Sequence, residues 1–148
     1  EETLISMKQL ELPVSDLEEF FRRAVFNVFA RNNDDHVKNV AFLMDRRGQW
    51  RLSPAYDLTF AYDPGNYWLR RHQMTINGKA ENFDLQDLEM LGSLAGLKKK
   101  KTLEVIKRVW EAIKNWRKLA EVQGIDPQRT DAIGKTIDDC VKGIIQYL

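Results

Sequence analysis

Apolar side chains recur at helical intervals in the first third of this chain. Between residues 16 and 30 they follow the i, i+3, i+4 spacing of a single helix face: Leu17, Phe20, Phe21, Ala24, Val25, Val28 and Phe29. Ser15 and Glu18 have the spacing of a capping box, in which each side chain binds the backbone N–H of the other. We therefore predict that the first helix is buried, covers about 16–30 and is capped by Ser15.

A short hairpin is predicted to follow. Residues 40–44 are apolar and favour a strand, residues 45–49 contain turn-forming Asp and Gly, and residues 50–52 can return as the second strand. Pro54 cannot donate a ladder hydrogen bond, so it ends the strand. This leaves Asp57 on a loop directly after the hairpin.

The second half of the chain changes from an irregular to a helical pattern. Residues 61–82 carry Pro, Gly and Asn at several positions and are expected to lack regular structure. Apolar residues then recur at helical spacing over about 84–95, 102–123 and 127–147, and a break at 124–127 separates the last two segments. The pattern thus predicts a mostly helical α+β chain with one small hairpin.

The composition is that of an ordinary globular domain. Of the 148 residues, 43% are hydrophobic and 30% are charged. No segment approaches the roughly 18 consecutive apolar residues needed to cross a bilayer, and no signal-peptide pattern is present, so we expect no membrane insertion. The single cysteine, Cys140, cannot form an internal disulfide, which favours a reducing, cytoplasmic location.

The charge balance gives no general attraction to polyanions. The chain has 23 basic and 22 acidic side chains, and its net charge is +1. We therefore interpret the arginine pairs at 22–23, 46–47 and 70–71 and the lysine run 98–101 as solvated faces. Direct binding of nucleic acid is not expected.

The stretch NNDDHVKN, residues 32–39, carries far more chemistry than a connector needs. It places two acids, an imidazole, an amine and three carboxamides between two apolar runs. Asp34 and Asn39, followed about 18 residues later by Asp57, could bring three oxygen ligands to one point. Mg²⁺ prefers such carboxylate and carboxamide oxygens, together with phosphate and water.

These are the parts that phosphoryl transfer needs. One aspartate accepts the proton of the substrate hydroxyl, an asparagine and a second aspartate hold the metal, and a lysine neutralises the transferring charge. Each residue also has a structural interpretation. Asp34 and Asp35 could form a solvated turn. Asn39 could satisfy backbone groups of the loop, and Asp57 could close an Asx-turn.

The same residues carry a resemblance to a known family. The strings FNVFARNNDDHVKNVAFLMD, GQWRLSPAYDLTFAYDP and HQMTINGK resemble the C-terminal lobe of HipA-type serine/threonine kinases, the toxin halves of bacterial toxin–antitoxin pairs. The resemblance runs over about 15–130. It implies that Asp34 is the catalytic base and that Asn39 and Asp57 hold Mg²⁺ beside ATP. The order D-x-H-x-x-N also occurs in phosphoinositide 3-kinase-like enzymes, but the segment SPAYDL fits the HipA group better.

The resemblance implies roles for three further residues. His36 and Lys38 correspond to catalytic-loop residues near the phosphates, and Tyr56 to a residue beside the nucleotide. From the residues alone, His36 could instead orient backbone carbonyls. Lys38 could pair with Asp35, and Tyr56 could be a packed aromatic side chain.

The resemblance also implies a fold and partners. Residues 1–148 would form a single C-terminal lobe of protein-kinase-like (HipA- and phosphoinositide-kinase-like) fold, with the hairpin beside the catalytic loop. The nucleotide-binding N-terminal lobe of the family has no room in the segment EETLISMKQLELPV that precedes the first predicted helix. We therefore expect that lobe in the same or a separate chain, and poor ATP binding without it. The expected partner is a DNA-binding antitoxin, and the expected substrate is a protein, usually an aminoacyl-tRNA synthetase.

Three functions stay open at this stage. The leading hypothesis is a kinase catalytic lobe with Asp34 as its base. The second is a non-catalytic interaction module derived from a kinase lobe, which would bind its partner without Mg²⁺ and ATP. The third is a metal-dependent phosphoesterase built on Asp34, Asp35, His36 and Asp57, since two-metal hydrolases use similar ligands.

Overall fold

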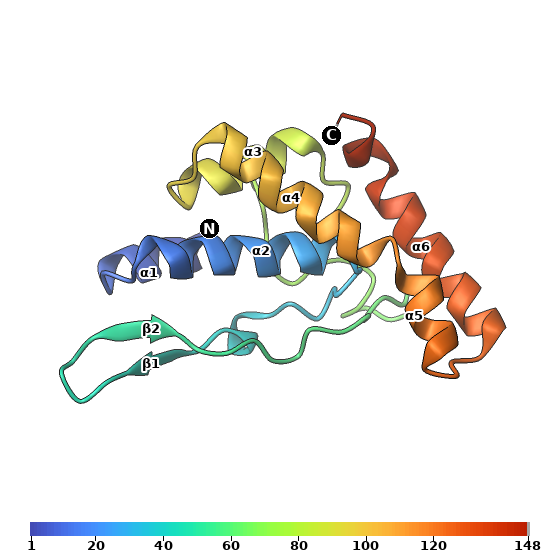
Figure 1. Cartoon of the computed structure of the whole chain (residues 1–148), viewed down its shortest axis with the longest axis horizontal. Helices are drawn as coiled ribbons and strands as arrows, with labels where there is room; N and C mark the ends of the chain where they lie inside the picture. The colour runs from blue at the N-terminus through green and yellow to red at the C-terminus, as the bar shows by residue number, and fades with distance from the viewer. Residues whose placement is uncertain (148) are drawn as a thin grey trace.

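The computed structural model describes residues 1–147 and shows a mostly helical chain with one two-stranded antiparallel sheet, as predicted (Figure 1). In chain order the elements are α1 (Glu2–Gln9), α2 (Val14–Phe29), the 3-10 turn η1 (Val37–Asn39), β1 (Phe42–Met44), β2 (Trp50–Leu52), α3 (Leu85–Leu94), α4 (Lys99–Ile113), α5 (Trp116–Val122) and α6 (Pro127–Ile145). Within residues 1–147 every helix is too short or too polar to cross a membrane.

α2 is the central element of the fold. It packs against α1, α3, α4, α6 and β2, and Figure 1 shows it passing between the hairpin on one side and α3 and α4 on the other. The predicted apolar stripe forms its buried face, where the side chains of Phe21, Val25 and Phe29 are removed from solvent. Each such side chain stabilises the fold by about 1.5–3 kcal/mol. α2 is therefore a firm support for the polar loop that follows it.

The N-terminal segment differs from the prediction. Residues Glu2–Gln9 form α1, whereas the pattern predicts no helix before about residue 16. Leu4 and Met7, three positions apart, are fully buried in the core. Two buried positions are too few for periodicity to reveal a helix, so tertiary packing sets α1 more than the local pattern does.

The predicted capping box is wrong. α2 begins directly after Pro13, so Ser15 and Glu18 both lie inside the helix. The anchor at this end is Asp16. Its carboxylate accepts two 2.8 Å hydrogen bonds from the guanidinium of Arg51 and one 2.8 Å bond from the backbone N–H of Leu52. These bonds, that from Arg51 above all, hold the pKa of Asp16 below its usual value. They also fasten β2 to α2.

The hairpin follows the prediction. Its strands pair Phe42 with Leu52, Leu43 with Arg51 and Met44 with Trp50. In the turn, the Asp45 carboxylate accepts hydrogen bonds from the N–H groups of Arg47 and Gln49, at 2.8 and 2.9 Å. Gly48 has a φ of +80°, a conformation that side chains other than glycine adopt at a cost.

The helix predicted over 102–123 is two helices. α4 ends at Ile113 and α5 starts at Trp116, because the Trp116 indole N–H donates to the carbonyl of Thr130 at 3.1 Å and turns α5 toward α6. The predicted break before the last helix is confirmed. There the Asp126 carboxylate caps α6 and Pro127 occupies its first turn.

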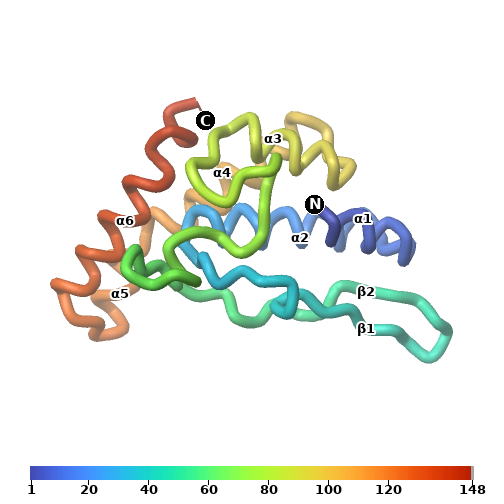
Figure 2. The backbone as a smooth tube through the Cα atoms, turned by 180° about the vertical axis from the view of Figure 1, so that it is seen from behind, coloured from blue at the N-terminus to red at the C-terminus, as the bar shows by residue number. Residues whose placement is uncertain are grey.

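Two irregular segments lie together on one side of α2. Figure 2, seen from behind, shows the long connection between β2 and α3 running beside the loop that leaves α2. A parallel bridge between Asn32 and Ala61 joins the two segments. The 61–82 region has no regular strand or helix, as predicted, and its buried His72 side chain contacts the polar loop.

Candidate functional site

The polar loop begins with a sharp turn at the end of α2. Arg31 has a φ of +55°, and the backbone N–H of Asn32 returns to the carbonyl of Asn27 at 2.9 Å. The Arg31 guanidinium lies 3.8 Å from the centre of the Tyr62 ring, a cation–π contact that holds the turn in this strained conformation. The loop therefore leaves the helix in one fixed direction.

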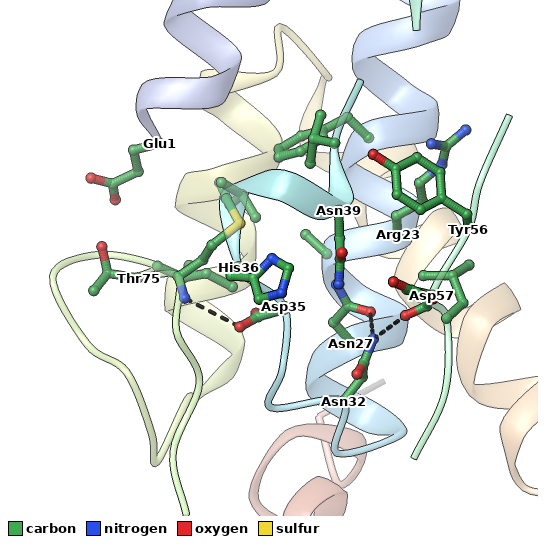
Figure 3. Close-up of a pocket in the computed structure, with 17 residues that line it drawn as sticks. Glu1, Arg23, Asn27, Asn32, Asp35, His36, Asn39, Tyr56, Asp57 and Thr75 are labelled. Atoms are coloured by element: carbon green, nitrogen blue, oxygen red, sulfur yellow. Dashed lines mark hydrogen bonds between the residues drawn. The ribbon is translucent and has the colours of Figure 1, made fainter. Parts of the chain in front are cut away.

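Two buried asparagines fix the first half of the loop. The side-chain N–H₂ of Asn32 donates to the side chain of Asn27 and to the backbone carbonyl of Asp57, both at 2.9 Å (Figure 3). Asn33 donates in the same way to the carbonyl of Leu69, also at 2.9 Å. Asn32 thus joins α2, the polar loop and the segment after the hairpin, and it sets where Asp57 sits.

Asp35 is the third buried anchor. One carboxylate oxygen lies 2.9 Å from Nδ1 of His72, and the other accepts from the backbone N–H groups of Gln73 and Met74 at 2.8 and 3.2 Å. Asp35 and His72 are both buried. Because a carboxylate only accepts, Nδ1 of His72 is the donor. The suggested pairing of Lys38 with Asp35 is therefore wrong, and so is the solvated-turn interpretation of Asp35.

Asp34 and His36 alternate with these anchors and are accessible. The Asp34 side chain is 50% exposed and that of His36 is 41% exposed, and their nearest polar atoms are 3.9 Å apart. The Asp34 carboxylate accepts no hydrogen bond within residues 1–147. It is thus free to receive a proton from an approaching hydroxyl, which a carboxylate buried like Asp35 is not.

Asn39 connects the end of the polar loop to Asp34. It closes η1, and its side-chain N–H₂ donates to the backbone carbonyl of Asp34 at 3.0 Å. Asn39 thus satisfies a backbone group of the loop through its nitrogen, as the structural interpretation proposed. Its carboxamide oxygen still has its lone pairs for a ligand. The Tyr56 hydroxyl donates to the Lys38 carbonyl at 2.8 Å and ties η1 to the segment after the hairpin.

Asp57 has an unusual backbone. Its φ is +52°, in the left-handed region that aspartate and asparagine tolerate better than most residues. Its carbonyl is held by Asn32, but its carboxylate makes no hydrogen bond or ion pair with residues 1–147. The suggested Asx-turn is therefore absent. A residue held at an uncommon φ, with an exposed and unpaired carboxylate, has the character of a ligand.

One small cavity collects most of the predicted residues. Its room of about 50 Å³ is enough for a few water molecules. Asp34 and Lys38 belong to the same loop but do not line this cavity. The four predicted site residues in its wall are His36, Asn39, Tyr56 and Asp57 (Figure 3).

The donor set of this cavity fits a magnesium ion. The Asp57 carboxylate and the Asn39 carboxamide oxygen are free hard ligands, the type that Mg²⁺ takes in small number together with phosphate oxygens and water. Oδ1 of Asn32 and Nδ1 of His36 are buried and have no partner within residues 1–147. Both residues line the cavity, so a metal-bound water could donate to Oδ1 of Asn32, and Nδ1–H of His36 could donate to a phosphate oxygen.

The phosphoesterase hypothesis requires Asp35 as a metal ligand. Within residues 1–147 no three His, Cys, Asp or Glu side chains are grouped as a metal site. Asp35, one of the acids in the phosphoesterase hypothesis, is fully occupied by His72 and two backbone N–H groups. Asp35 is therefore not available for the metal-binding role that the third hypothesis gives it.

Sequence reasoning missed the residues that support the site. The sequence shows Asn27, Asn32 and Asn33 only as polar residues near the end of a helix, and it predicted no role for His72. An asparagine such as Asn27, placed inside an apolar helical stripe, is a usable signal, since a half-buried carboxamide requires a partner. The pairing of Asp35 with His72 joins residues far apart in the chain and leaves no local pattern.

Comparison with known proteins assigns this chain to a family. The model of the HipA-like C-terminal domain family matches residues 2–117. The match includes α1, which the resemblance over about 15–130 left out, and it ends inside α5.

A Sinorhizobium fredii protein named "Putative kinase Y4dM" is 34% identical over 113 residues. The aligned region is 71% of this chain and 28% of that protein, so the chain spans little more than a quarter of its relative. The family match, by contrast, covers well over half of the chain. The chain therefore belongs to the family of HipA-like C-terminal domains.

Proposed function

We propose that this chain is the catalytic lobe of a HipA-like serine/threonine protein kinase of protein-kinase-like fold, which transfers the γ-phosphate of ATP to a protein hydroxyl. Asp34 takes the hydroxyl proton onto a carboxylate oxygen, and Asn39 and Asp57 hold Mg²⁺. The observation that carries the proposal is that Asn39 and Asp57 line one cavity although the hairpin separates them in the chain. Family membership and the name of the relative support the same activity.

The proposed roles follow from what each group can still bind. The Asp34 carboxylate is exposed, and its backbone is held by Asn39, so the base and a metal ligand share one hydrogen bond. Mg²⁺, when bound, would neutralise phosphate charge. His36 lines the cavity with an unpartnered ring nitrogen that can donate to a phosphate oxygen. Lys38 is exposed and in the same turn, and it supplies positive charge nearby.

The nucleotide needs more room than this cavity offers. Pockets for small ligands usually measure about 300–1,000 Å³, well above the roughly 50 Å³ of this cavity. We therefore propose that a second lobe, in the same or another chain, closes over the cavity and completes the ATP site, with Tyr56 at its edge. The toxin role, the DNA-binding antitoxin, the synthetase substrate and the cytoplasmic location are part of this proposal and rest on family membership alone.

Phosphate transfer tests the proposal. The complete protein is incubated with labelled ATP and Mg²⁺ beside an Asp34→Asn variant, and label on protein is counted. Removing the base should lower transfer by about 10²- to 10⁴-fold, and the melting temperature should stay unchanged because the side chain is half exposed. Asp139→Asn, which alters an exposed aspartate on α6, is the matched control and should transfer normally.

Two results would contradict the proposal. Transfer at the wild-type rate by the Asp34→Asn variant would remove the base assignment. Absence of label with every form, in protein shown to be folded, would favour the non-catalytic interaction module instead.

A further inference from the structure

A turn near the catalytic loop presents two aromatic rings to solvent. Tyr67 is 61% exposed and Trp68 is 64% exposed, and their rings meet edge to face with centroids 5.1 Å apart. The Arg70 guanidinium lies 4.8 Å from the centre of the Tyr67 ring. Large aromatic side chains that remain this exposed mark binding surfaces more often than isolated apolar residues do.

The turn is ordered by its own polar groups. The Asp63 carboxylate accepts from the N–H of Gly65 at 2.8 Å, and the side chain of Asn66 accepts from the N–H of Trp68 at 2.9 Å. The backbone carbonyl of Asn66 accepts from Leu69 and from the residue after it, at 3.2 and 3.0 Å. The aromatic rings are therefore held ready for contact, and little ordering entropy is lost when a partner binds.

The same turn is fastened to both sides of the base. Asn33, directly before Asp34, donates to the carbonyl of Leu69 at 2.9 Å. Gln73 donates its side-chain N–H₂ to the carbonyl of Trp68 and its backbone N–H to Asp35, directly after Asp34. Any chain that binds the aromatic turn is thus placed at a fixed position relative to the Asp34 carboxylate.

The charge at this surface is unbalanced. Arg70 and Arg71 are exposed and form no ion pair within residues 1–147, whereas Arg22 and Arg23 on α2 pair with glutamates of their own helix. The acid in the turn, Asp63, uses its carboxylate to cap the turn. Tyr, Trp and Arg are the residue types enriched in the energetic centres of protein interfaces.

We propose that Tyr67, Trp68, Arg70 and Arg71 form the docking surface for the protein substrate, and that they select a segment with acidic residues beside the acceptor hydroxyl. This inference rests on the proposed kinase function, and it adds the chemical class of the substrate segment. The aromatic rings bind apolar side chains of the segment, and the arginines bind its carboxylates. The net charge of only +1 favours a protein over a nucleic acid as the occupant.

Peptide binding to the complete protein tests the inference. The probes are two fluorescein-labelled peptides with one central serine, one flanked by aspartates and one by lysines, followed by fluorescence anisotropy. The acidic peptide should bind more tightly to the wild type. The double variant Arg70→Glu/Arg71→Glu should weaken its binding roughly tenfold or more and should reverse the preference toward the lysine peptide. Trp68→Ala should weaken binding of both peptides.

A matched control is present in the chain. Arg46→Glu/Arg47→Glu reverses another exposed arginine pair, on the hairpin turn, and should leave peptide binding unchanged. If this control weakened binding of the acidic peptide equally, the effect would come from the overall charge of the protein, and the inference would be overturned. Thermal melts of all variants confirm that they are folded, and Arg70→Gln/Arg71→Gln gives a second variant without charge reversal.

The outcomes separate the inference from the function on which it rests. Asp34→Asn should still bind the acidic peptide while failing to phosphorylate it. Phosphate transfer that is equally fast to the acidic and the lysine peptide would overturn the inference and leave the kinase intact. Binding of the acidic peptide without any transfer would support the docking surface and count against the kinase. Binding of labelled single-stranded RNA, lost in Trp68→Ala while peptide binding is not, would overturn the inference in favour of a nucleic acid.

Discussion

Asp34 and Asp35 are neighbours in the chain, but their side chains have different surroundings. The Asp34 carboxylate is half exposed and accepts no hydrogen bond within residues 1–147, whereas the Asp35 carboxylate is buried and accepts from His72 and two backbone N–H groups. Asn32 and Asn33 belong with Asp35, since their side chains are also buried and the N–H₂ group of each is bonded inside the protein. The loop therefore consists of a buried framework and an accessible set of groups that alternate within a few residues.

This difference shows how a loop can be both rigid and reactive. A group that holds the loop must have its hydrogen bonds made inside the protein, because a buried polar atom without a partner costs about 1–3 kcal/mol. A group that does chemistry must keep its lone pairs for a substrate or metal. Here Asp35 meets the first requirement, and Asp34, the proposed base, has a carboxylate free for the second.

As for the proposed base, a large loss of phosphate transfer is expected when either of the two side chains proposed to hold the metal is changed. Asn39→Ala and Asp57→Asn should each lower phosphate transfer by more than about 100-fold, because a metal contributes several kcal/mol to the transition state. Asparagine tolerates the left-handed backbone of Asp57, so that variant should keep its stability. The loss is measured from phosphate transfer rates over a Mg²⁺ titration. The Mg²⁺ concentration that gives half of the maximal rate should also rise in both variants. Unchanged Mg²⁺ dependence would contradict the assignment.

Substitution of Asp35 tests the buried framework of the loop. Asp35→Ala leaves His72 and the N–H groups of Gln73 and Met74 without partners in a buried region. The free energy of unfolding should fall by roughly 2–4 kcal/mol, as measured by urea denaturation. Asp34→Ala is the matched control and should change stability by less than about 0.5 kcal/mol. Equal effects of the two substitutions would remove the distinction between framework and accessible groups.

A third acid supplies a reference for the buried framework. Asp16 is buried and bonded by Arg51, which together with a backbone N–H keeps the pKa of Asp16 below the usual 3.8. A carboxyl whose pKa is lowered on folding stabilises the protein above its unfolded pKa, and this contribution is lost as the pH falls through the lowered pKa. Asp16→Asn should therefore cost roughly 1–2 kcal/mol at pH 7. The difference in free energy of unfolding between the wild type and the variant should shrink below pH 3.8. Urea denaturation at a series of pH values down to about pH 2.5 measures this difference. A difference that stays constant over this range would contradict this account.

The sequence predicted the parts of the fold that depend on local patterns. The apolar stripe of α2, the turn of the hairpin and the break before α6 are each set by residues within a few positions of one another. The site residues came from spacing and resemblance, and the structure brings His36, Asn39, Tyr56 and Asp57 to one cavity. Their roles stay predictions until transfer is measured.

What could not be predicted depends on contacts between distant residues. The bond from Arg51 to Asp16 replaced the predicted capping box, and the bond from Trp116 to Thr130 divided a predicted helix. The partner of Asp35, His72, follows the hairpin in the chain and is 37 residues away. Such contacts form when packing brings two segments together, and no local period records them.

The smallest effect is expected at Tyr56, where it separates two interpretations. Tyr56→Phe removes only the hydroxyl that donates to the Lys38 carbonyl, at an exposed position. Stability should fall by about 0.5 kcal/mol or less. If the hydroxyl mainly holds η1, kcat should fall a few-fold while KM for ATP stays the same. If Tyr56 instead contacts the nucleotide through its hydroxyl, KM should rise with kcat unchanged. Tyr147→Phe, at an exposed tyrosine beyond α6, is the control. We expect the kcat effect, because the one observed partner of the hydroxyl is the loop that carries Asp34 and Asn39.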